Sequence, residues 1–372
     1  IADYFLVHDR DIYLRSDDSV VRIVGNKQRF LRRSRGYVPV PIFLKKRLKP
    51  ILACGAELKN TVCLTRETHA FLSQHIGDLE NLATYEFFEM TITHLKRVLS
   101  IEPEIIAHDM HPNYLSTRYA MEQGHRVRID VQHHHAHIVS CMAENHVEEP
   151  VIGLAFDGTG YGSDGGIWGG EVLIVRPHTF ERAAHLAYTP MPGGAAAIKE
   201  PWRMAISYLY GAYGRDLFHR RLPCLEGLDE TRLNMRIEMR EKDINSPRTS
   251  RLGRVCEGSA AMLGLRSHVA FEGQAAMELE MAAEAWTGDV YEYEWSSADA
   301  IRIDPHPVVT GVVRDIEKGV TPSVVSGKFH ATLTAMFTDL CRVIRKETGI
   351  TQVALSGGCF QNAILLSGLT KH

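Results

Sequence analysis

The chain has 372 residues, of which 45% are hydrophobic and 23% are charged, and this is an ordinary composition for a globular protein. One compact core seldom grows to that length, so we expect two or three domains. The formal net charge of −3 gives no electrostatic basis for nucleic acid or an anionic membrane as the main partner. No apolar run reaches the roughly 18 residues that a transmembrane helix needs.

The seven cysteines are scattered along the chain and contain no C-x-x-C pair. This usage predicts reduced, buried thiols in a cytoplasmic protein and excludes a zinc ribbon built from cysteines. The first residues lack the basic-then-apolar pattern of a signal peptide and already resemble the interior of a domain. Because the chain also stops just after a predicted helix, we expect a fragment that lacks its C-terminal tail.

Strand-like alternation opens the chain, and helical spacing follows it. In order, the predicted elements of the first part are strands at 4–8, 11–15 and 19–24, a Gly- and Pro-rich linker at 34–50, a hairpin of 50–55 with 61–65, a helix at 78–99, and strands at 104–109 and 128–131. The last of these strands runs directly into a histidine-rich helix.

A second set of elements begins with a buried strand at 150–157. The pattern of 200–285 is mostly helical with a polar loop at 245–251, and a late strand at 349–355 ends in a Gly-Gly turn. Strands thus alternate with long helices in two successive sets. This order predicts an α/β architecture in two lobes.

The histidine-rich helix offers a possible metal site. His133 and His137 are four residues apart, so on a helix both imidazoles lie on one face and can reach a single divalent ion. Carboxylates or water from elsewhere would complete the coordination, and such a site suits Fe(II) or Zn(II). His134 and His135 face elsewhere, and one of them is a candidate for contact with substrate. The alternative is a run of surface or core histidines without a ligand.

A glycine-rich loop, Asp157-Gly158-Thr159-Gly160, follows the buried strand of the second lobe. Glycines let a backbone pass close to a phosphate and point its N–H groups at it, and an Asp at a strand end can hold a metal or water nearby. Asp-Gly is also the commonest signal for a plain hairpin. Both interpretations can hold together, as a hairpin that cradles phosphate.

The late turn combines Gly357 and Gly358 with a following helix and Asn362. The two glycines permit flat approach of a ribose or adenine, and the N-terminus of the helix favours anions. Any tight strand-to-helix turn has the same appearance, so this pattern alone is a weak signal.

A third glycine pair, Gly193 and Gly194, precedes Lys199 and Arg203 at the start of a predicted helix. The two cations are placed to clamp a phosphate. The alternative is that Pro201 only starts the helix and that Lys199 is solvated.

The combination of these motifs resembles the acetate kinase, sugar kinase, Hsp70 and actin superfamily, and within it the Kae1-like branch. The string at 133–137 is similar to the H-H-x-A-H motif of carbamoyltransferases. Other stretches resemble the HypF family of hydrogenase-maturation carbamoyltransferases, and they lie at 55–61, 73–79, 109–114, 192–194 with 199–203, and 271–276. The start of the chain, at 8–20 and 32–37, resembles the end of that family's YrdC-like domain, so the resemblance spans essentially the whole chain.

The resemblance implies a two-lobed α/β fold of that superfamily in three parts. They are the end of a YrdC-like domain with a linker at 1–46, a first Kae1-like lobe at 47–149, and a second lobe at 150–372, which carries a helical insertion at about 200–290 and lacks its tail.

It also implies a reaction. In the family, carbamoyl phosphate and ATP give carbamoyl-adenylate, and the Kae1-like domain passes the carbamoyl group to the C-terminal cysteine of HypE. The product becomes the cyanide ligand of [NiFe] hydrogenase. The nucleophile comes from this partner, so we assign none of the chain's own cysteines to catalysis.

Roles for individual residues follow from the resemblance. It implies that His133, His137 and Asp157 bind a divalent metal, that His134, Lys199 and Arg203 act in catalysis, and that Gly158, Thr159, Gly160, Gly193, Gly194, Glu272, Gly357, Gly358 and Asn362 bind ATP or AMP, with Mg²⁺ possible beside the nucleotide.

The chain departs from the family in two respects. Glu257 stands where the family has Asp in a G-R-L-F-D motif, and the C-terminal motif that supplies a further Asp ligand to the metal is missing. Other functions share these features: a Kae1-type subunit for threonylcarbamoyl transfer to tRNA, an O-carbamoyltransferase for small molecules, and a nucleotide-binding scaffold without catalysis.

Overall fold

The computed structural model describes residues 3–124, 127–297 and 299–371. The chain divides into two compact units, residues 1–131 and 132–372. Each unit combines strands with helices, as the sequence predicts. The domain limits that the resemblance implies, with a first lobe ending at 149, stay a prediction.

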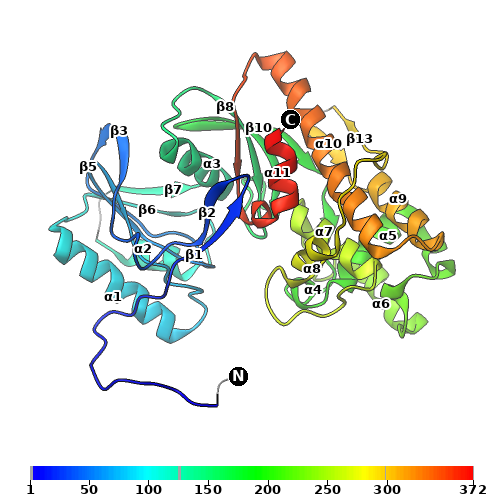
Figure 1. Ribbon diagram of the computed structural model, residues 1–372, viewed down its shortest axis with the longest axis horizontal. Coiled ribbons are helices and arrows are strands. Elements are labelled where there is room, and N and C mark those ends of the chain that lie inside the picture. The colour runs from blue at the N-terminus through cyan, green and yellow to red at the C-terminus, as the bar shows by residue number, and fades with distance from the viewer. Residues whose placement is uncertain (1–2, 125–126, 298, 372) are drawn as a thin grey trace. The chain divides into compact units, whose positions relative to one another are not determined.

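The first unit is built on a five-stranded sheet in the order β3-β5-β4-β6-β7, in which β4, β6 and β7 are parallel and β5 is antiparallel to both of its neighbours. Side chains from α1, α2 and the sheet form one apolar cluster, which includes Leu52, Leu64, Phe88, Ile106 and Ala120. The elements of the unit (Figure 1) are β1 Val20–Val24, β2 Lys27–Arg32, β3 Ile42–Leu48, β4 Ile51–Ala53, β5 Cys63–Leu72, α1 Leu82–Leu99, β6 Ile105–Asp109, α2 Leu115–Glu122 and β7 Val127–Val131.

Two predictions for the start of the chain are wrong. Residues 4–15 form no strand, and their large apolar side chains are mostly exposed. The predicted linker at 34–50 contains β3, which pairs with β5 at the edge of the sheet. Alternating apolar residues thus predicted strands at 4–8 and 11–15, where the structure pairs the chain with no neighbouring strand. The prolines at 34–50 suggested a linker, although prolines are tolerated beside an edge strand such as β3.

The second unit is built on a six-stranded sheet in the order β13-β14-β10-β9-β8-β15. The helix α3 packs on one face through Ile138 and Met142, beside Ala155 of β8. The next residue of that strand, Phe156, points to the other face and contacts Phe337 of α10, with ring centroids 4.3 Å apart. Because successive side chains of a strand alternate, β8 lies in a layer between the two helices.

The elements of the second unit appear in Figure 1 in green to red. They are α3 His133–Glu144, β8 Val151–Phe156, β9 Gly170–Arg176, β10 Thr179–Leu186, β11 Thr189–Pro190, α4 Ala196–Lys199, α5 Trp202–Tyr213, η1 Gly214–His219, η2 Pro223–Leu225, α6 Glu230–Glu241, β12 Arg248–Thr249, α7 Leu252–Met262, α8 Gln274–Ala282, β13 Glu294–Ser296, β14 Ile301–Asp304, α9 His306–Glu317, α10 Pro322–Thr348, β15 Val353–Ser356, η3 Gly358–Gln361 and α11 Ala363–Lys371. The helical run predicted for 200–285 is thus confirmed by α5 to α8.

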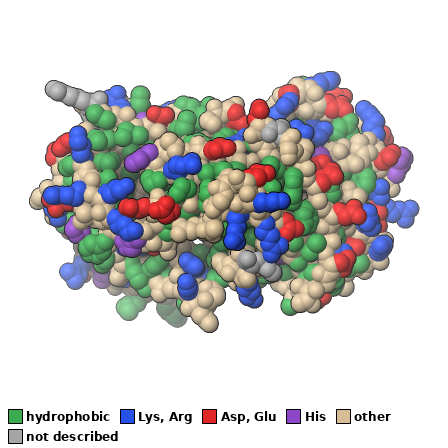
Figure 2. All heavy atoms as spheres, turned by 90° about the horizontal axis from the view of Figure 1, so that it is seen from above, with side chains coloured by type: hydrophobic (Ala, Val, Ile, Leu, Met, Phe, Trp, Pro, Cys, Tyr) green, Lys and Arg blue, Asp and Glu red, His purple; other side chains and the backbone are tan. Residues whose placement is uncertain are grey.

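The surface carries both signs of charge. On the face drawn in Figure 2, Lys and Arg side chains are interspersed with Asp and Glu, in keeping with a formal net charge of −3. Across the described residues, none of the helices is both long enough and apolar enough to span a bilayer.

Candidate functional site

Three predicted metal ligands meet at the second unit's sheet. The Nε2 atoms of His133 and His137 lie 3.0 Å and 3.2 Å from the same oxygen, Oδ2 of Asp157. One ligand atom from each residue lies within 4.8 Å of the others. The histidines come from the first two turns of α3, and Asp157 follows the last residue of β8. The face predicted from the i, i+4 spacing is therefore the face that meets the carboxylate.

The local sequence explains why these elements point at one another. Gln132 caps α3 by accepting a hydrogen bond from the His135 N–H at 2.9 Å, so the helix starts with its first histidines at the sheet. The strands β8 and β15 are parallel neighbours, and their carboxyl ends therefore lie at one edge. Asp157, which follows β8, therefore lies beside Ser356 at the end of β15 and beside Gly357 and Gly358.

Asp157 is held by the Gly-Gly turn as well as by the histidines. Its Oδ1 accepts a hydrogen bond from the Gly358 N–H at 3.0 Å. A Cβ on Gly358 would lie 2.9 Å from that same Oδ1, and Gly357 adopts φ of 110° with no room for a Cβ beside the Phe156 carbonyl. Both glycines are thus required for the close approach of the turn to the carboxylate.

The charge of Asp157 is stabilised by its partners. Burial raises the pKa of this carboxyl, but the hydrogen bonds with His133 and His137 outweigh burial and hold the pKa well below its usual range. The carboxylate is therefore ionised at neutral pH. Beyond it, the Nδ1 of His137 lies 3.4 Å from the Ser356 hydroxyl, a partner of the kind that fixes the orientation of a metal-bound histidine.

The donor set fits a divalent transition metal. Two imidazole nitrogens and one carboxylate oxygen leave room for further ligands, as in sites that bind Zn(II) or Fe(II) and keep positions open. The side chains are partly accessible, with 13%, 29% and 17% exposed for His133, His137 and Asp157, so an ion and a ligand can reach them from solvent.

His134 lies next to the three ligands and is fully buried. Its imidazole sits against Gly160, where a Cβ would lie 2.1 Å from the ring carbon Cε1. Its Nδ1 is 3.3 Å from the Gln132 side-chain amide, whereas its Nε2 has no hydrogen-bond partner among the described residues. Burial first, and then the neighbouring His133 and His137, hold the pKa of His134 well below its ordinary value, so the ring is neutral.

The predicted nucleotide-binding residues fall into two groups. Gly158, Thr159 and Gly160 continue from Asp157, and Glu272 Oε1 lies 3.1 Å from where a Cβ of Gly158 would be. This first group therefore lies next to Asp157 and His134, and Gly358 contacts Asp157 from the other turn.

The second group is formed by Gly193, Gly194 and Arg203. A Cβ on Gly193 would lie 2.8 Å from Nη1 of Arg203, whose Nε donates to the Glu200 carboxylate. Lys199 ends α4 with an exposed side chain. The cations thus lie near a Gly-Gly turn, as the spacing indicates, but Arg203 already has a carboxylate partner.

Asn362 has a structural role that the sequence did not reveal. Its Nδ2 donates to His330 Nε2 at 2.8 Å, and its Oδ1 accepts from the Leu365 N–H at 2.9 Å. Each polar atom of this side chain has one partner inside the protein, and the contact with adenosine stays a prediction.

Sequence reasoning missed several residues around the site. Ser356 lies beside His137, and Gln132 orients both α3 and His134. Gln132 had a usable signal, because a polar residue directly before a helix is a cap candidate. The partners of the 157–169 connection, such as Arg182, had none, since they come from other strands.

Comparison with known proteins identifies the family. Residues 46–144 match the family model described as "HypF Kae1-like domain", and residues 153–372 match "Carbamoyltransferase, Kae1-like Domain, second subdomain". Residues 1–45 precede both matches.

Curated relatives match along the chain. Carbamoyltransferase HypF of Synechocystis sp. is 40% identical over 383 residues, which cover 99% of this chain and 49% of the relative. The protein of that name from Rhizobium leguminosarum is 39% identical over 372 residues, covering 100% and 47%. The chain thus spans about half the length of these relatives. A HypF homolog of Cupriavidus necator is 35% identical over 325 residues and is covered to 82%.

Solved structures agree with these relatives. A crystal structure of full-length HypF in the phosphate- and nucleotide-bound form superposes with a TM-score of 0.94 at 45% identity, covering 100% of this chain and 58% of that one. HypF of T. kodakarensis superposes with a TM-score of 0.86 at 33% identity, covering 96% and 48%. The predicted two-lobed Kae1-like α/β fold is confirmed, and the chain belongs to the HypF carbamoyltransferase family.

Proposed function

We propose that the chain transfers a carbamoyl group from carbamoyl-adenylate, made from carbamoyl phosphate and ATP, to the C-terminal cysteine of a HypE-like protein during [NiFe]-hydrogenase maturation. Membership of the HypF family supports the transfer, and the site in the second unit supports its location. The observation that carries the proposal is the convergence of His133, His137 and Asp157 beside two glycine-rich turns.

The chemistry is an acyl transfer. Carbamoyl-adenylate is a mixed anhydride, and the thiolate of the acceptor attacks its carbonyl carbon. A C–S bond forms, the C–O bond to phosphate breaks, and AMP leaves with the electron pair. The thiol proton passes to solvent before the attack. A divalent ion held by the three ligands would supply a positive charge that polarises the carbonyl or binds phosphate.

The protein's own groups bind and orient the substrate. The backbone of Gly158, Thr159 and Gly160 cradles the phosphate, and Glu272 with the Gly357-Gly358 turn binds the nucleoside. His134 offers its buried Nε2 to an oxygen of the reacting group, where a donor that needs no solvent rearrangement is most effective. Lys199 and Arg203, with Gly193 and Gly194, form a second anchor for phosphate.

A binding experiment tests this assignment. The purified protein should contain close to one equivalent of Fe or Zn, and calorimetry should detect binding of ATP or AMP. The double variant His133→Ala/His137→Ala should lose the metal and bind nucleotide at least tenfold more weakly, because two of three ligands are removed.

A histidine of the same helix provides the control. His135 points away from the triad and its Nε2 lies 3.2 Å from the Arg176 carbonyl, so His135→Ala should retain both metal and nucleotide. If the double variant and the wild type bound nucleotide equally and neither held metal, a scaffold without catalysis would be the better assignment.

A further inference from the structure

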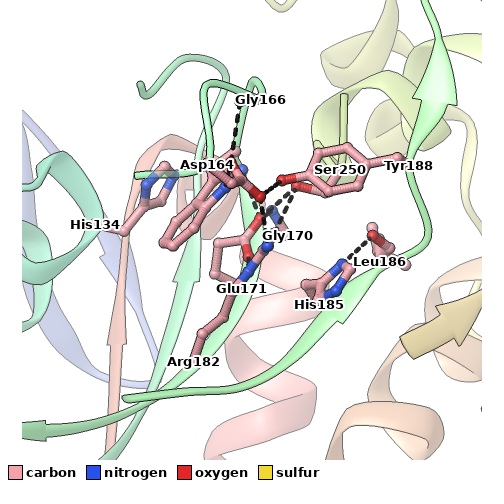
Figure 3. Close-up of polar contacts among 12 residues, drawn as sticks. His134, Asp164, Gly166, Gly170, Glu171, Arg182, His185, Leu186, Tyr188 and Ser250 are labelled. Atoms are coloured by element: carbon pink, nitrogen blue, oxygen red, sulfur yellow. Dashed lines mark hydrogen bonds and ion pairs between the residues drawn. The ribbon is translucent and has the colours of Figure 1, made fainter. Parts of the chain in front are cut away.

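A network of polar side chains, which runs from the surface to the buried Glu171, contacts the connection from Asp157 to Gly169, and it includes none of the residues assigned above to binding or catalysis. At its centre is Asp164, whose side chain is 43% exposed. Oδ1 of this residue accepts from the Trp168 Nε1–H at 2.8 Å and from the Gly166 N–H at 3.0 Å. Oδ2 accepts from the Tyr188 hydroxyl at 2.6 Å and from Arg182 at 3.1 Å. Four donors thus converge on one carboxylate (Figure 3).

Arg182 links this carboxylate to a second one. Its Nε donates to Glu171 at 2.6 Å, and Glu171 is fully buried. Oε1 of Glu171 accepts from the N–H groups of Gly169 and Gly170 and from the Ser250 hydroxyl. The far end of the connection is therefore fixed by the same ionic network, in which every charge has a partner.

Trp168 connects the network to His134, because it contacts both Asp164 and the imidazole. The guanidinium of Arg182 lies 4.0 Å from the centroid of the indole ring, and Trp168 is 2% exposed. The imidazole of His134 contacts the indole with ring centroids 5.9 Å apart, and its Cε1 abuts Gly160. The imidazole is thus clamped between an aromatic side chain and a backbone position that has no room for a side chain.

The network around Gln132 also defines the tautomer of His134. Oε1 of Gln132 accepts from the His135 N–H, and Nε2 donates to the Tyr161 carbonyl at 3.1 Å. The amide nitrogen therefore faces His134 Nδ1, which must accept, and the ring proton resides on Nε2. That N–H is one of the buried side-chain groups without a hydrogen-bond partner among the described residues.

We propose that Asp164 is a positioning residue: through Trp168 it holds the imidazole of His134 so that Nε2–H stays directed to an oxygen of the ligand bound at the 157–160 loop. The oxygen belongs to a phosphoryl or carbonyl group, and this part rests on the proposed function. The positioning itself is a property of the protein without ligand. A buried donor without a partner is costly, and it persists because its surroundings leave the ring no alternative position.

The ring nitrogens of His134 can be observed directly. Long-range ¹H–¹⁵N spectra of the whole protein labelled at histidine should show His134, assigned through its loss in His134→Gln, as a single Nε2–H tautomer. In Asp164→Asn the side chain loses two of its four acceptor contacts, because an amide nitrogen cannot accept from Arg182 and Tyr188. The imidazole is then no longer held by Trp168 against the Gln132 amide, so its Nδ1 loses a fixed hydrogen-bond donor and both ring signals should move toward the average of two tautomers.

Asp315→Asn is the matched control. Asp315 accepts from the Tyr291 hydroxyl at 2.9 Å and faces Lys328 at 3.4 Å, so it has the same kinds of partner without any contact with Trp168 in the described residues. Its variant should also lower the melting temperature, since Asp315 is the more buried of the two carboxylates, but it should leave the signals of His134 unchanged. Signals of His134 that superpose in the wild type and Asp164→Asn would overturn the proposal.

The milder variant Tyr188→Phe covers the case in which Asp164→Asn does not fold. It removes a single hydroxyl from Asp164 and should shift the His134 signals in the same direction by a smaller amount. No shift in this variant, with the fold intact, would equally contradict the proposal. Because all spectra are recorded without metal or nucleotide, they stand apart from the binding experiment that tests the function.

Discussion

His330 shows how a single buried histidine depends on being neutral. Its Nδ1 lies 2.8 Å from the Ser326 carbonyl, which can only accept, so Nδ1 carries the proton. Its Nε2 accepts from the Asn362 amide at 2.8 Å. Burial lowers the pKa of His330 below its ordinary value of 6.5, and the contact with Ser326 offsets only part of this effect. A second proton would face the amide N–H of Asn362.

We expect this histidine to make stability fall with acidification. The unfolded chain binds a proton near pH 6.5 and the folded chain binds it only at lower pH, so the contribution is fully present above pH 6.5 and is lost as pH falls below it. One such group contributes a slope of at most about 1.4 kcal/mol per pH unit. The unfolding free energy of the wild type, measured with denaturant from pH 7.5 to 5, should therefore fall more steeply than that of His330→Gln. Equal slopes would show that the pKa of His330 is the same in the folded and the unfolded chain.

The contact between α3 and β8 sets the metal-ligand geometry at the level of elements. A Cβ on Gly153 would lie 2.7 Å from Cγ1 of Ile138, so the helix rests directly on the backbone of the strand. Because His133 and His137 belong to α3 and Asp157 follows β8, any shift between the two elements alters the distances among the three ligands.

Gly153→Ala should accordingly destabilise the protein and weaken metal binding together. Overpacking of this kind costs about 1–3 kcal/mol, and a displaced helix should raise the dissociation constant of Zn²⁺ several-fold. Combining it with Ile138→Ala removes the opposing methyl groups, so a double-mutant cycle should show a combined loss smaller than the sum of the single losses. Gly253→Ala is the control, since its Cβ would meet only Cys359 Sγ at an ordinary 3.8 Å. Additive losses of unfolding free energy would mean that the new Cβ at position 153 does not clash with Ile138.

Elements with strong periodicity or a marked boundary were predictable, and elements defined by their partners were not. The helix α1 follows from its apolar spacing and is capped after Leu99 by Ser100 in a left-handed conformation, and β8 follows from a continuous buried run. In contrast, β3 is a strand because it pairs with β5, and most of its residues are exposed, so its sequence shows no buried face. No local pattern distinguishes such an edge strand from a linker.

At the scale of the whole molecule, the same division applies to the site. The spacing of His133 and His137 determined their common face, but that Asp157 is the third member depends on the order of strands in the sheet and was implied only by the family resemblance. The roles of Asp164, Arg182 and Asn362 depend on contacts between segments far apart in sequence. Such contacts become visible only when the chain is folded.

The thiols of the chain also have a property that belongs to the whole fold. Burial raises the pKa of five of them to about 12, namely Cys54, Cys63, Cys224, Cys256 and Cys341, and it raises that of Cys359 well above its usual value. At pH 8 a thiol with a pKa of about 12 is a thiolate in roughly one molecule in 10,000. These six cysteines are therefore poor nucleophiles, in line with the proposal that the acceptor thiol belongs to another protein.

Alkylation should distinguish the thiol of the proposed acceptor from the chain's own thiols by their reactivity. In the native protein at pH 8, iodoacetamide should modify these six cysteines at least a hundred times more slowly than in the urea-unfolded chain, because both the thiolate fraction and access are reduced. Mass spectrometry of digested samples gives the rate for each residue. Protein treated under native conditions should still pass carbamoyl groups to a HypE-like acceptor, whereas pretreatment of the acceptor should abolish transfer. Rapid native modification of Cys359, the thiol whose pKa is also raised by Asp157, accompanied by proportional loss of transfer, would place a nucleophile in this chain after all.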